Sequence, residues 1–254
     1  MNLHALESFL SIPLPGSIRS LFQHTAVPNP DVDVMRLMEP SEAIEHTKAL
    51  RGSWMNLNSD ILLLWTDDNS NYAGVFFQGD LAPRVAIIDH EETEDTPRFF
   101  SVESFEAARN AGIDQDQPWY EFLPDYPVTS AEYPMHDTDR ELALKYLADY
   151  RRRPDKARHL AFYALNLLPP GDTPIVCEFL WSDDMWVQER VCAIIGHRRY
   201  APATQDLHEM ALRGSHNGRI AAILALKKIR SPDARECLAS LKRDLGDSFA
   251  PYFR

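Results

Sequence analysis

Three short apolar runs, separated by polar turns, stand out in the first half of the chain. They span Ile61–Thr66, Tyr72–Gln78 and Arg84–Asp89, and they are rich in Ile, Val, Phe and Trp. Asp, Asn and Gly fill the turns between them, as in Asp67–Asn71 and Gly79-Asp80. Apolar runs of this length, bounded by turn residues, predict the strands of an antiparallel meander.

A helix is predicted soon after the meander. Ser101 is a suitable N-cap, Phe105 and Ala108 lie on one helical face, and Gly112 is expected to end the helix. The pattern therefore changes from strand to helix within one compact segment, which favours an α+β fold.

The order of these elements resembles the SUKH superfamily, which includes bacterial immunity proteins and the yeast Smi/Knr type of cell-wall regulator. The resemblance rests on the meander, an acidic loop, Phe99-Phe100 and the Ser-Phe-Glu start of the helix. Upstream, Leu14-Pro15 resembles the family's early helix, and Leu37–Glu45 resembles its strand and short helix. The resemblance covers roughly residues 3–112. It implies an antiparallel or mixed sheet with flanking helices, and a non-enzymatic binding role.

Residues 113–136 have the composition of a linker, with four prolines and no helical or strand period. Aromatic side chains are costly to leave in water, so the linker is expected to pack on both neighbouring domains. We therefore expect domains at 1–112 and 137–254. The aromatic residues of the linker are Trp119, Tyr120, Phe122, Tyr126 and Tyr133.

After the linker, apolar positions follow a helical period that repeats every 31 residues. Each unit consists of two predicted helices joined by a short turn that contains Pro. These units resemble short HEAT-like repeats over roughly residues 155–246, and they predict an all-α solenoid preceded by a helix that starts at a Thr138–Glu141 capping box. The predicted core of the solenoid comprises Val191, Ile195, Leu207, Leu226, Leu238 and Leu241.

Charge is distributed unevenly along the chain, whose net charge is −12. Residues 1–136 hold 7 Lys+Arg and 22 Asp+Glu, whereas residues 137–254 hold 19 and 16. The first part should repel nucleic acid and attract basic surfaces. The alternative is that the charge serves only solubility.

The cysteines and the hydropathy pattern indicate a cytoplasmic protein. Cys177, Cys192 and Cys237 lie in apolar helical patterns without C-x-x-C spacing, so we expect small buried side chains rather than disulfides or metal ligands. No apolar stretch is long enough to span a bilayer, and residues 1–16 lack the basic region of a signal peptide. Neither a cofactor nor a metal is expected.

The loops at the strand ends carry the candidate binding residues. Asp67 and Asp68 either make the turn or contact a partner, and Trp65 just before them is either a core residue or a hydrophobic anchor whose ring lines a groove. The acidic segment that starts at Asp89 could suggest a metal site, but adjacent residues of an extended chain point to opposite sides, which favours a solvated loop. The predicted partner-binding residues are Trp65, Asp67, Asp68, Asn71, Tyr72, Asp89, Glu91 and Glu92.

Three functions remain open from the sequence. No nucleophile elbow, Walker A loop or dinucleotide fingerprint occurs, so no catalytic residue is expected. The first hypothesis is an immunity protein that neutralises a basic, nuclease-like toxin domain, and the second is a regulatory adaptor that uses both domains. The third is a HEAT-like nucleic-acid repair enzyme, but Arg151–Arg153 and His197–Arg199 are its only basic clusters. The oligomeric state is not predicted.

Overall fold

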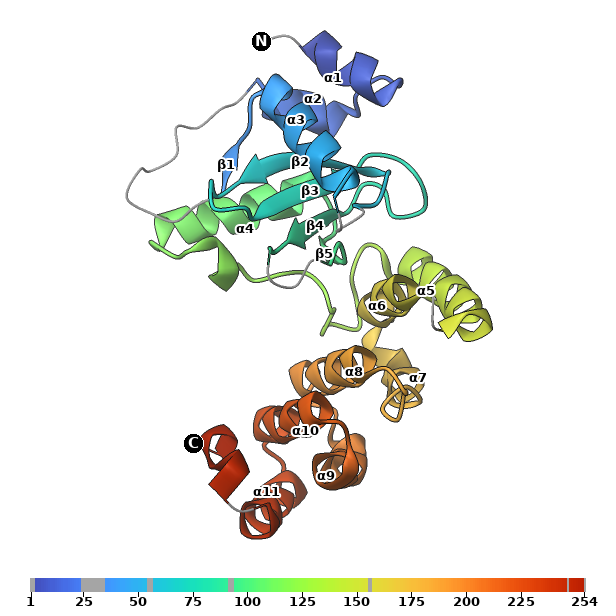
Figure 1. The fold of residues 1–254 in the computed structure, drawn as a ribbon, viewed down its shortest axis with the longest axis vertical. Coiled ribbons are helices and arrows are strands. Elements are labelled where there is room, and N and C mark those ends of the chain that lie inside the picture. The colour runs from blue at the N-terminus through green and yellow to red at the C-terminus, as the bar shows by residue number, and fades with distance from the viewer. Residues whose placement is uncertain are drawn as a thin grey trace. The chain divides into compact units, whose positions relative to one another are not determined.

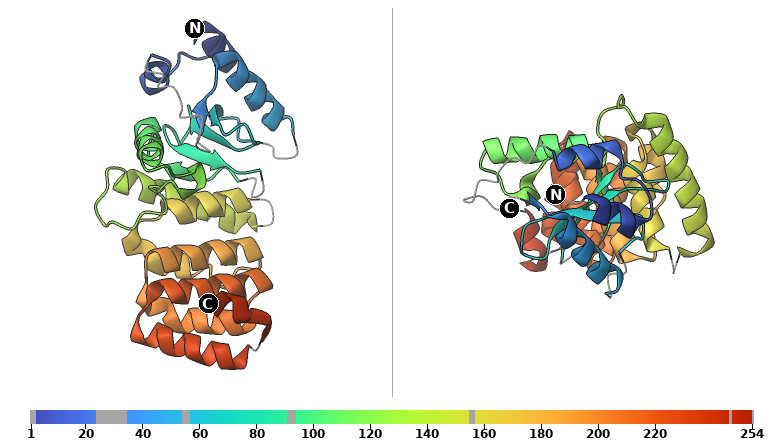
Figure 2. Two further views of the ribbon diagram at one scale, coloured as in Figure 1. Left: turned by 90° about the vertical axis from the view of Figure 1, so that its left-hand side faces the viewer. Right: turned by 90° about the horizontal axis from the view of Figure 1, so that it is seen from above.

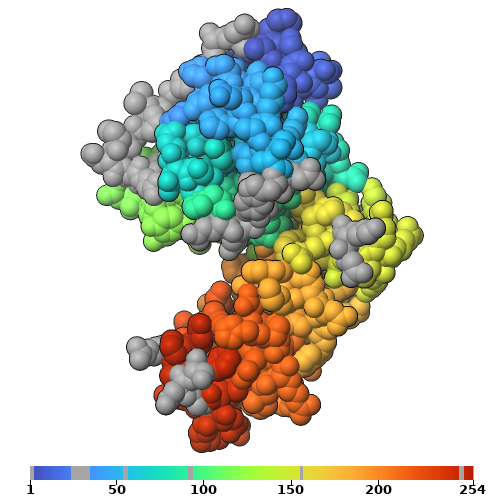
Figure 3. All heavy atoms as spheres, viewed as in Figure 1, coloured from blue at the N-terminus to red at the C-terminus, as the bar shows by residue number. Residues whose placement is uncertain are grey.

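The computed structural model describes residues 3–23, 35–53, 57–90, 94–154, 157–245 and 247–253 (coloured in Figures 1 and 3). The chain forms two compact units, Met1–Tyr126 and Pro127–Arg254. The boundary falls inside the predicted linker, so residues 113–126 pack with the first unit and 127–136 with the second. The fold is α+β, with an antiparallel sheet in the first unit and helices in the second.

Within the described residues, the sheet has five strands in the order β1-β2-β3-β4-β5, and every neighbouring pair is antiparallel. The three strands predicted from the sequence are confirmed as β2, β3 and β4, the last two slightly shorter than expected. Short strands β1 and β5 form the two edges. The elements of this unit are α1 Leu3–Leu10, α2 Gly16–Leu21, β1 Arg36–Leu37, α3 Pro40–Arg51, β2 Ile61–Thr66, β3 Tyr72–Phe76, β4 Val85–Ile88, β5 Pro97–Phe99, α4 Val102–Asp114 and the 3-10 turn η1 Trp119–Glu121.

Helices cover both faces of the sheet. Tyr72 of β3 packs against His46 of α3. Its cross-strand partner is Thr66, so the preceding residue, Trp65, points to the opposite face, where it packs on Phe105 of α4 with ring centroids 4.6 Å apart. Figures 1 and 2 show α3 and α4 on opposite sides of the sheet. Strands β2 and β3 are consequently buried along their whole length, as strands covered on both faces are.

Gly112 lies inside α4, so the prediction that it ends the helix is wrong. The predicted start is correct, because the Ser101 side chain accepts a hydrogen bond from the backbone N–H of Ser104. A Cβ atom at Gly112 would lie 2.2 Å from Cε1 of Phe122. The glycine therefore allows the chain after the helix to fold back onto α4, and the helix continues to Asp114.

We expect Gly112→Ala to lower the free energy of unfolding. The added methyl must displace the Phe122 ring, and overpacking of this kind costs about 1–3 kcal/mol, more than the gain in helix propensity of about 1 kcal/mol. Chemical denaturation measures the difference. Gly16→Ala is the control, because nothing lies within 4 Å of a Cβ at that position. Equal stability of the two variants would contradict a tight contact at Gly112.

Helices make up the second unit, and α8 and α10 pack side by side at its centre (Figure 1). Of the six predicted core residues, five have no exposed surface, but Leu238 is only half-buried. Leu238 belongs to α11, beyond which the structure describes only η5. The elements are α5 His136–Arg152, α6 Arg158–Leu167, η3 Pro170–Asp172, α7 Thr173–Cys177, α8 Met185–His197, η4 Ala201–Ala203, α9 Thr204–Arg213, α10 His216–Ile229, α11 Pro232–Asp244 and η5 Asp247–Phe253.

The first helix of this unit starts earlier than predicted. The backbone N–H of Asp139 donates to the carbonyl of Met135, so Thr138 lies within the first turn of α5 and does not cap it. The predicted capping box is therefore wrong.

Arg198 at the end of α8 holds several segments of the second unit together. Its Nε donates to the carbonyl of Val128 at 3.1 Å, and its Nη1 donates to the carbonyl of Pro169 and to Oγ1 of Thr173. Nη2 donates to the carbonyl of Leu168. Burial among these groups lowers the pKa of Arg198 to about 10. The sequence placed Arg198 in a basic cluster that could contact nucleic acid. In the structure its guanidinium instead stabilises the fold of the second unit.

Candidate functional site

Most of the predicted binding residues that the structure describes lie at one end of the sheet. The turn between β2 and β3 is next to the end of β4, because Tyr72 pairs with Ile88. The Asn71 side-chain oxygen accepts a hydrogen bond from the backbone N–H of His90 at 3.0 Å. Asp89 therefore lies beside the turn that carries Asp67, even though about twenty residues separate them in the sequence.

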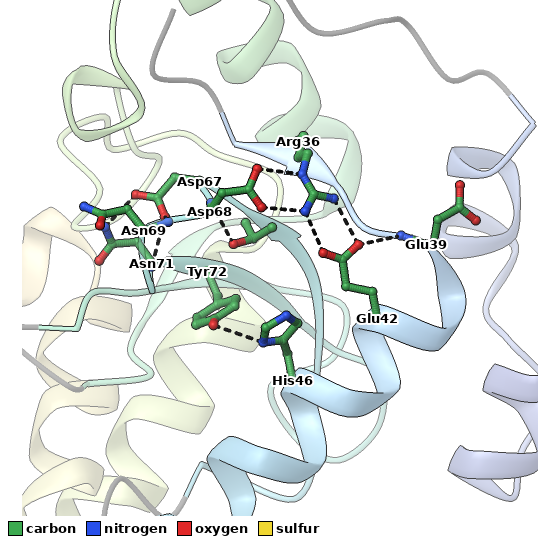
Figure 4. Close-up of polar contacts among 10 residues, drawn as sticks. Arg36, Glu39, Glu42, His46, Asp67, Asp68, Asn69, Asn71 and Tyr72 are labelled. Atoms are coloured by element: carbon green, nitrogen blue, oxygen red, sulfur yellow. Dashed lines mark hydrogen bonds and ion pairs between the residues drawn. The ribbon is translucent and has the colours of Figure 1, made fainter. Parts of the chain in front are cut away.

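Asp67 builds the turn rather than facing a partner. Its Oδ1 accepts from the backbone N–H groups of Asn69 and Asn71 at 2.8 and 3.0 Å, and its Oδ2 accepts from the Asn71 side-chain amide at 2.6 Å (Figure 4). Asp68 and Ser70 take positive φ angles of 61° and 70°. The turn-making interpretation of Asp67 is thus the one that the hydrogen bonds support. Asn71 is itself buried, with 4% of its surface exposed.

Arg36 of β1 bridges two carboxylates at this site (Figure 4). Its Nε and Nη2 donate to Asp68 at 2.8 and 2.5 Å, and its Nη1 and Nη2 donate to Glu42 of α3 at 3.0 and 2.6 Å. Hydrogen bonding to Arg36 holds the pKa of Glu42 and that of Asp68 below their usual values. Arg36 was not predicted as a site residue, because it lies 32 residues from Asp68 and no local sequence pattern connects the two.

The two predicted aromatic anchors are not open to a partner. Trp65 has no exposed surface, and its indole N–H donates to Glu106 of α4 at 2.8 Å. The prediction that its ring lines a groove is wrong, because both faces of β2 are covered. Tyr72 is 9% exposed, and its hydroxyl lies 3.1 Å from Nδ1 of His46. Burial raises the pKa of Tyr72, with a smaller contribution from Asp67.

Two of the predicted acidic side chains reach solvent at this end of the sheet. The Asp68 side chain is 61% exposed and that of Asp89 is 35% exposed. Asp89 Oδ1 lies 3.7 Å from Nδ1 of His90. Glu91 and Glu92 lie outside the described residues, so their part in the site stays a prediction.

The described residues include neither a cluster of potential metal ligands nor a cysteine with a lowered pKa. No group of three or more His, Cys, Asp or Glu side chains there could hold a metal ion. Burial raises the pKa of Cys177 to about 11 and raises the pKa of Cys192 and Cys237 as well. These three thiols remain protonated near neutral pH and are poor nucleophiles.

No family model matches the chain, and neither a curated protein nor a solved structure matches it. None of the helices in the described ranges is both long and apolar enough to cross a bilayer.

We expect Arg36→Gln to raise the pKa of Glu42 and Asp68 toward their ordinary values of 4.5 and 3.8. Because the folded-state values are lowered, the bridge stabilises the fold above those ordinary values, and this stability is lost as pH falls through the lowered ones. The loss of stability in the variant should therefore be largest near neutral pH and vanish in acid. Solvent screens the pair, so the effect should be about 1 kcal/mol or less.

Carboxyl titration by NMR, with denaturation at several pH values, checks this expectation. Arg19→Gln is the matched control, because Arg19 pairs with Glu7 in a different part of the same unit. If the Glu42 titration midpoint is the same in wild type and Arg36→Gln, the bridge does not form in solution.

Proposed function

We propose that the protein is a non-enzymatic, cytoplasmic binding protein that captures and neutralises a basic protein partner, as an immunity protein does with a toxin domain. In this proposal a SUKH-like unit is followed by a HEAT-like array, and the SUKH-like unit makes the contact. The observation that carries the proposal is the charge of the first unit: residues 1–126 hold 7 Lys+Arg against 21 Asp+Glu.

Two cations of this unit, Arg84 and Arg109, are buried, although Arg109 also pairs with Glu106 at 3.3 Å. Arg84 has no exposed surface and donates to the Tyr126 hydroxyl and the Leu81 carbonyl. Arg109 is 4% exposed and donates to the carbonyl of Met35 at 2.6 Å. The exposed surface is therefore more acidic than the residue count alone suggests, which favours fast association with a basic partner.

The sheet end supplies a rigid place for such a contact. The Asp67 hydrogen bonds and the Arg36 bridge fix the turn before any partner arrives, so little conformational freedom is lost on binding. Asp68 and Asp89 are acidic groups of this site that reach solvent, and the sequence adds Glu91 and Glu92 next to Asp89.

A regulatory adaptor is the second candidate, and a surface of the helical unit favours it. Trp181, Met185 and Trp186 around the start of α8 are 51%, 41% and 44% exposed. Large apolar side chains that cluster on a surface often mark protein contacts. An adaptor would use this surface for one client and the acidic unit for another.

The repair-enzyme hypothesis gains less support. Arg198 donates inward to backbone carbonyls, and Arg151 forms an ion pair with Glu178 at 2.7 Å. These contacts leave fewer guanidinium N–H groups of the two basic clusters for binding a phosphate backbone.

Affinity capture with the full-length protein as bait tests the proposal, with the captured protein then produced on its own. We expect a basic partner whose association slows as salt rises, and whose toxicity on expression is relieved by co-expression of this chain. An acidic partner, or one whose capture is abolished by Trp186→Ala but not by charge changes in the first unit, would refute the proposal in favour of an adaptor. Salt-dependent DNA binding would instead favour the enzyme.

A further inference from the structure

A pocket of about 270 Å³ lies in the first unit beside the acidic sheet end. One wall comes from β4, β5 and the described residues next to them, and it carries Asp89, Glu94, Thr96 and Arg98. The other wall comes from η1 and the residues after it, and it includes Trp119 and Tyr120. The volume is below the roughly 300–1,000 Å³ of pockets that hold whole small molecules, so it suits a single side chain.

The fold holds this pocket in place. Ile87 of β4 pairs with Ala73, so it lies on the face of the sheet that α4 covers, and Asp89 follows directly after the end of this strand. The aromatic wall is tied to the same helix, because Phe122 packs directly on Gly112. Both walls are thus anchored to one rigid element.

The chemistry of the lining favours a cation. Asp89 and Glu94 contribute two carboxylates against the single guanidinium of Arg98, so the pocket keeps an excess negative charge even where these groups pair with one another. Trp119 and Tyr120 stand edge to face, with ring centroids 5.8 Å apart, and Tyr120 is 66% exposed. Exposed aromatic faces next to carboxylates attract cations.

Thr96 supplies a further, independent observation. It is 2% exposed, and its Oγ1 has no hydrogen-bond partner among the described residues. Buried hydroxyl groups are almost always paired, so an unsatisfied one in a pocket wall indicates a missing donor or acceptor.

We propose that this pocket binds the guanidinium group of an arginine side chain from the basic partner. The inference rests on the proposed function, and it names the group that the acidic unit recognises. A guanidinium is flat enough to stack on the aromatic wall, and its several N–H groups can bond a carboxylate at the same time. Rotation of the Thr96 side chain about χ1 would bring its buried hydroxyl to the same guanidinium. An ammonium group is a compact, strongly hydrated charge without this planar fork, so lysine fits the same lining less well.

Titration of the full-length protein with N-acetyl-arginine amide, followed through the Trp119 indole N–H signal in NMR spectra, tests the proposal. Comparison with Trp119→Phe assigns the signal. We expect a saturable shift with the arginine probe, binding about tenfold weaker for the lysine analogue, and weaker still for the neutral isostere N-acetyl-citrulline amide.

Two variants and one control complete the test. Asp89→Asn and Thr96→Val should each weaken the arginine probe several-fold, whereas Glu103→Gln on the exposed surface of α4 should leave it unchanged. Thr96→Val replaces an unsatisfied hydroxyl by an isosteric methyl, so it is expected to fold even if Asp89→Asn does not. The proposal is overturned if the arginine probe gives no saturable Trp119 shift, if citrulline or lysine binds as well as arginine, or if neither variant weakens binding.

The pocket and the proposed function can fail separately. If the probe fails while a basic partner is still captured, the contact lies elsewhere on the unit and only the pocket is refuted. If the probe binds but the captured partner is not basic, the pocket stands and the proposed function fails.

Discussion

Replacement of Leu226 by alanine is expected to lower the free energy of unfolding of the helical unit by about 2–5 kcal/mol. Leu226 has no exposed surface and belongs to α10, which packs against α8, α9 and α11. Removing its side chain leaves a cavity at the centre of the array. In a stack of helix pairs, the stability of each pair depends on its neighbours, so a defect in the middle weakens two interfaces.

The same helix provides a matched control. Leu224 lies two residues before Leu226 and is 41% exposed, so Leu224→Ala makes the same chemical change on the outer face. Its cost should be within about 0.5 kcal/mol of zero, as for most surface substitutions. Urea denaturation of both variants measures the contrast. Similar losses in both, or a loss below about 1 kcal/mol for Leu226→Ala, would mean that α10 packs differently.

Patterns local in the sequence predicted the main elements. Alternation between short apolar runs and turn residues located β2, β3 and β4, and the Ser101 cap located the start of α4. The helical period also identified Leu226 and its companions as core. These predictions succeeded because strand and helix periods depend on nearest neighbours along the chain.

The errors concern contacts between distant segments. A fully apolar strand such as β2 has no alternation to show whether a second layer covers it, so Trp65 could be taken for a surface anchor. Gly112 was assigned to a helix end because glycine often occurs there, whereas its contact with Phe122 depends on a turn ten residues later. Leu238 matched the repeat but lies in α11, where fewer elements remain to cover it.

In the candidate site, too, local features were predicted from the sequence and contacts between distant segments were not. Its acidic composition was visible in the sequence, and the structure adds how the groups are used. Asp67 is committed to its own turn and Asp68 to Arg36, so reversing either charge would disturb the local fold as well as the surface potential. A charge test of partner binding must therefore change Asp89 and the predicted residues beside it, and leave the turn intact.

Neutralising Asp89 and reversing its two acidic neighbours, as Asp89→Asn, Glu91→Lys and Glu92→Lys, should slow association with the basic partner about tenfold or more at low salt. Long-range attraction steers the encounter and raises association rates by about 10–1,000-fold, and it weakens as the acidic potential falls. The dissociation rate should change less, because steering acts mainly before contact. The dependence of the association rate on salt should become shallower in the same variant. Stopped-flow kinetics across a salt series measures both rates.

A second variant distinguishes the effect of charge at the sheet end from the effect of the net charge of the protein. Glu103→Lys, Ala107→Lys and Asp114→Lys on the exposed side of α4 change the net charge by the same amount but leave the sheet end untouched. If the sheet end is the contact, this control should slow association clearly less than the Asp89 variant, because the closest charges dominate at a separation of about one Debye length. Both variants must keep the wild-type circular dichroism spectrum. Equal slowing by the two would assign the effect to net charge alone, and unchanged kinetics in the Asp89 variant would move the interface away from this end of the sheet.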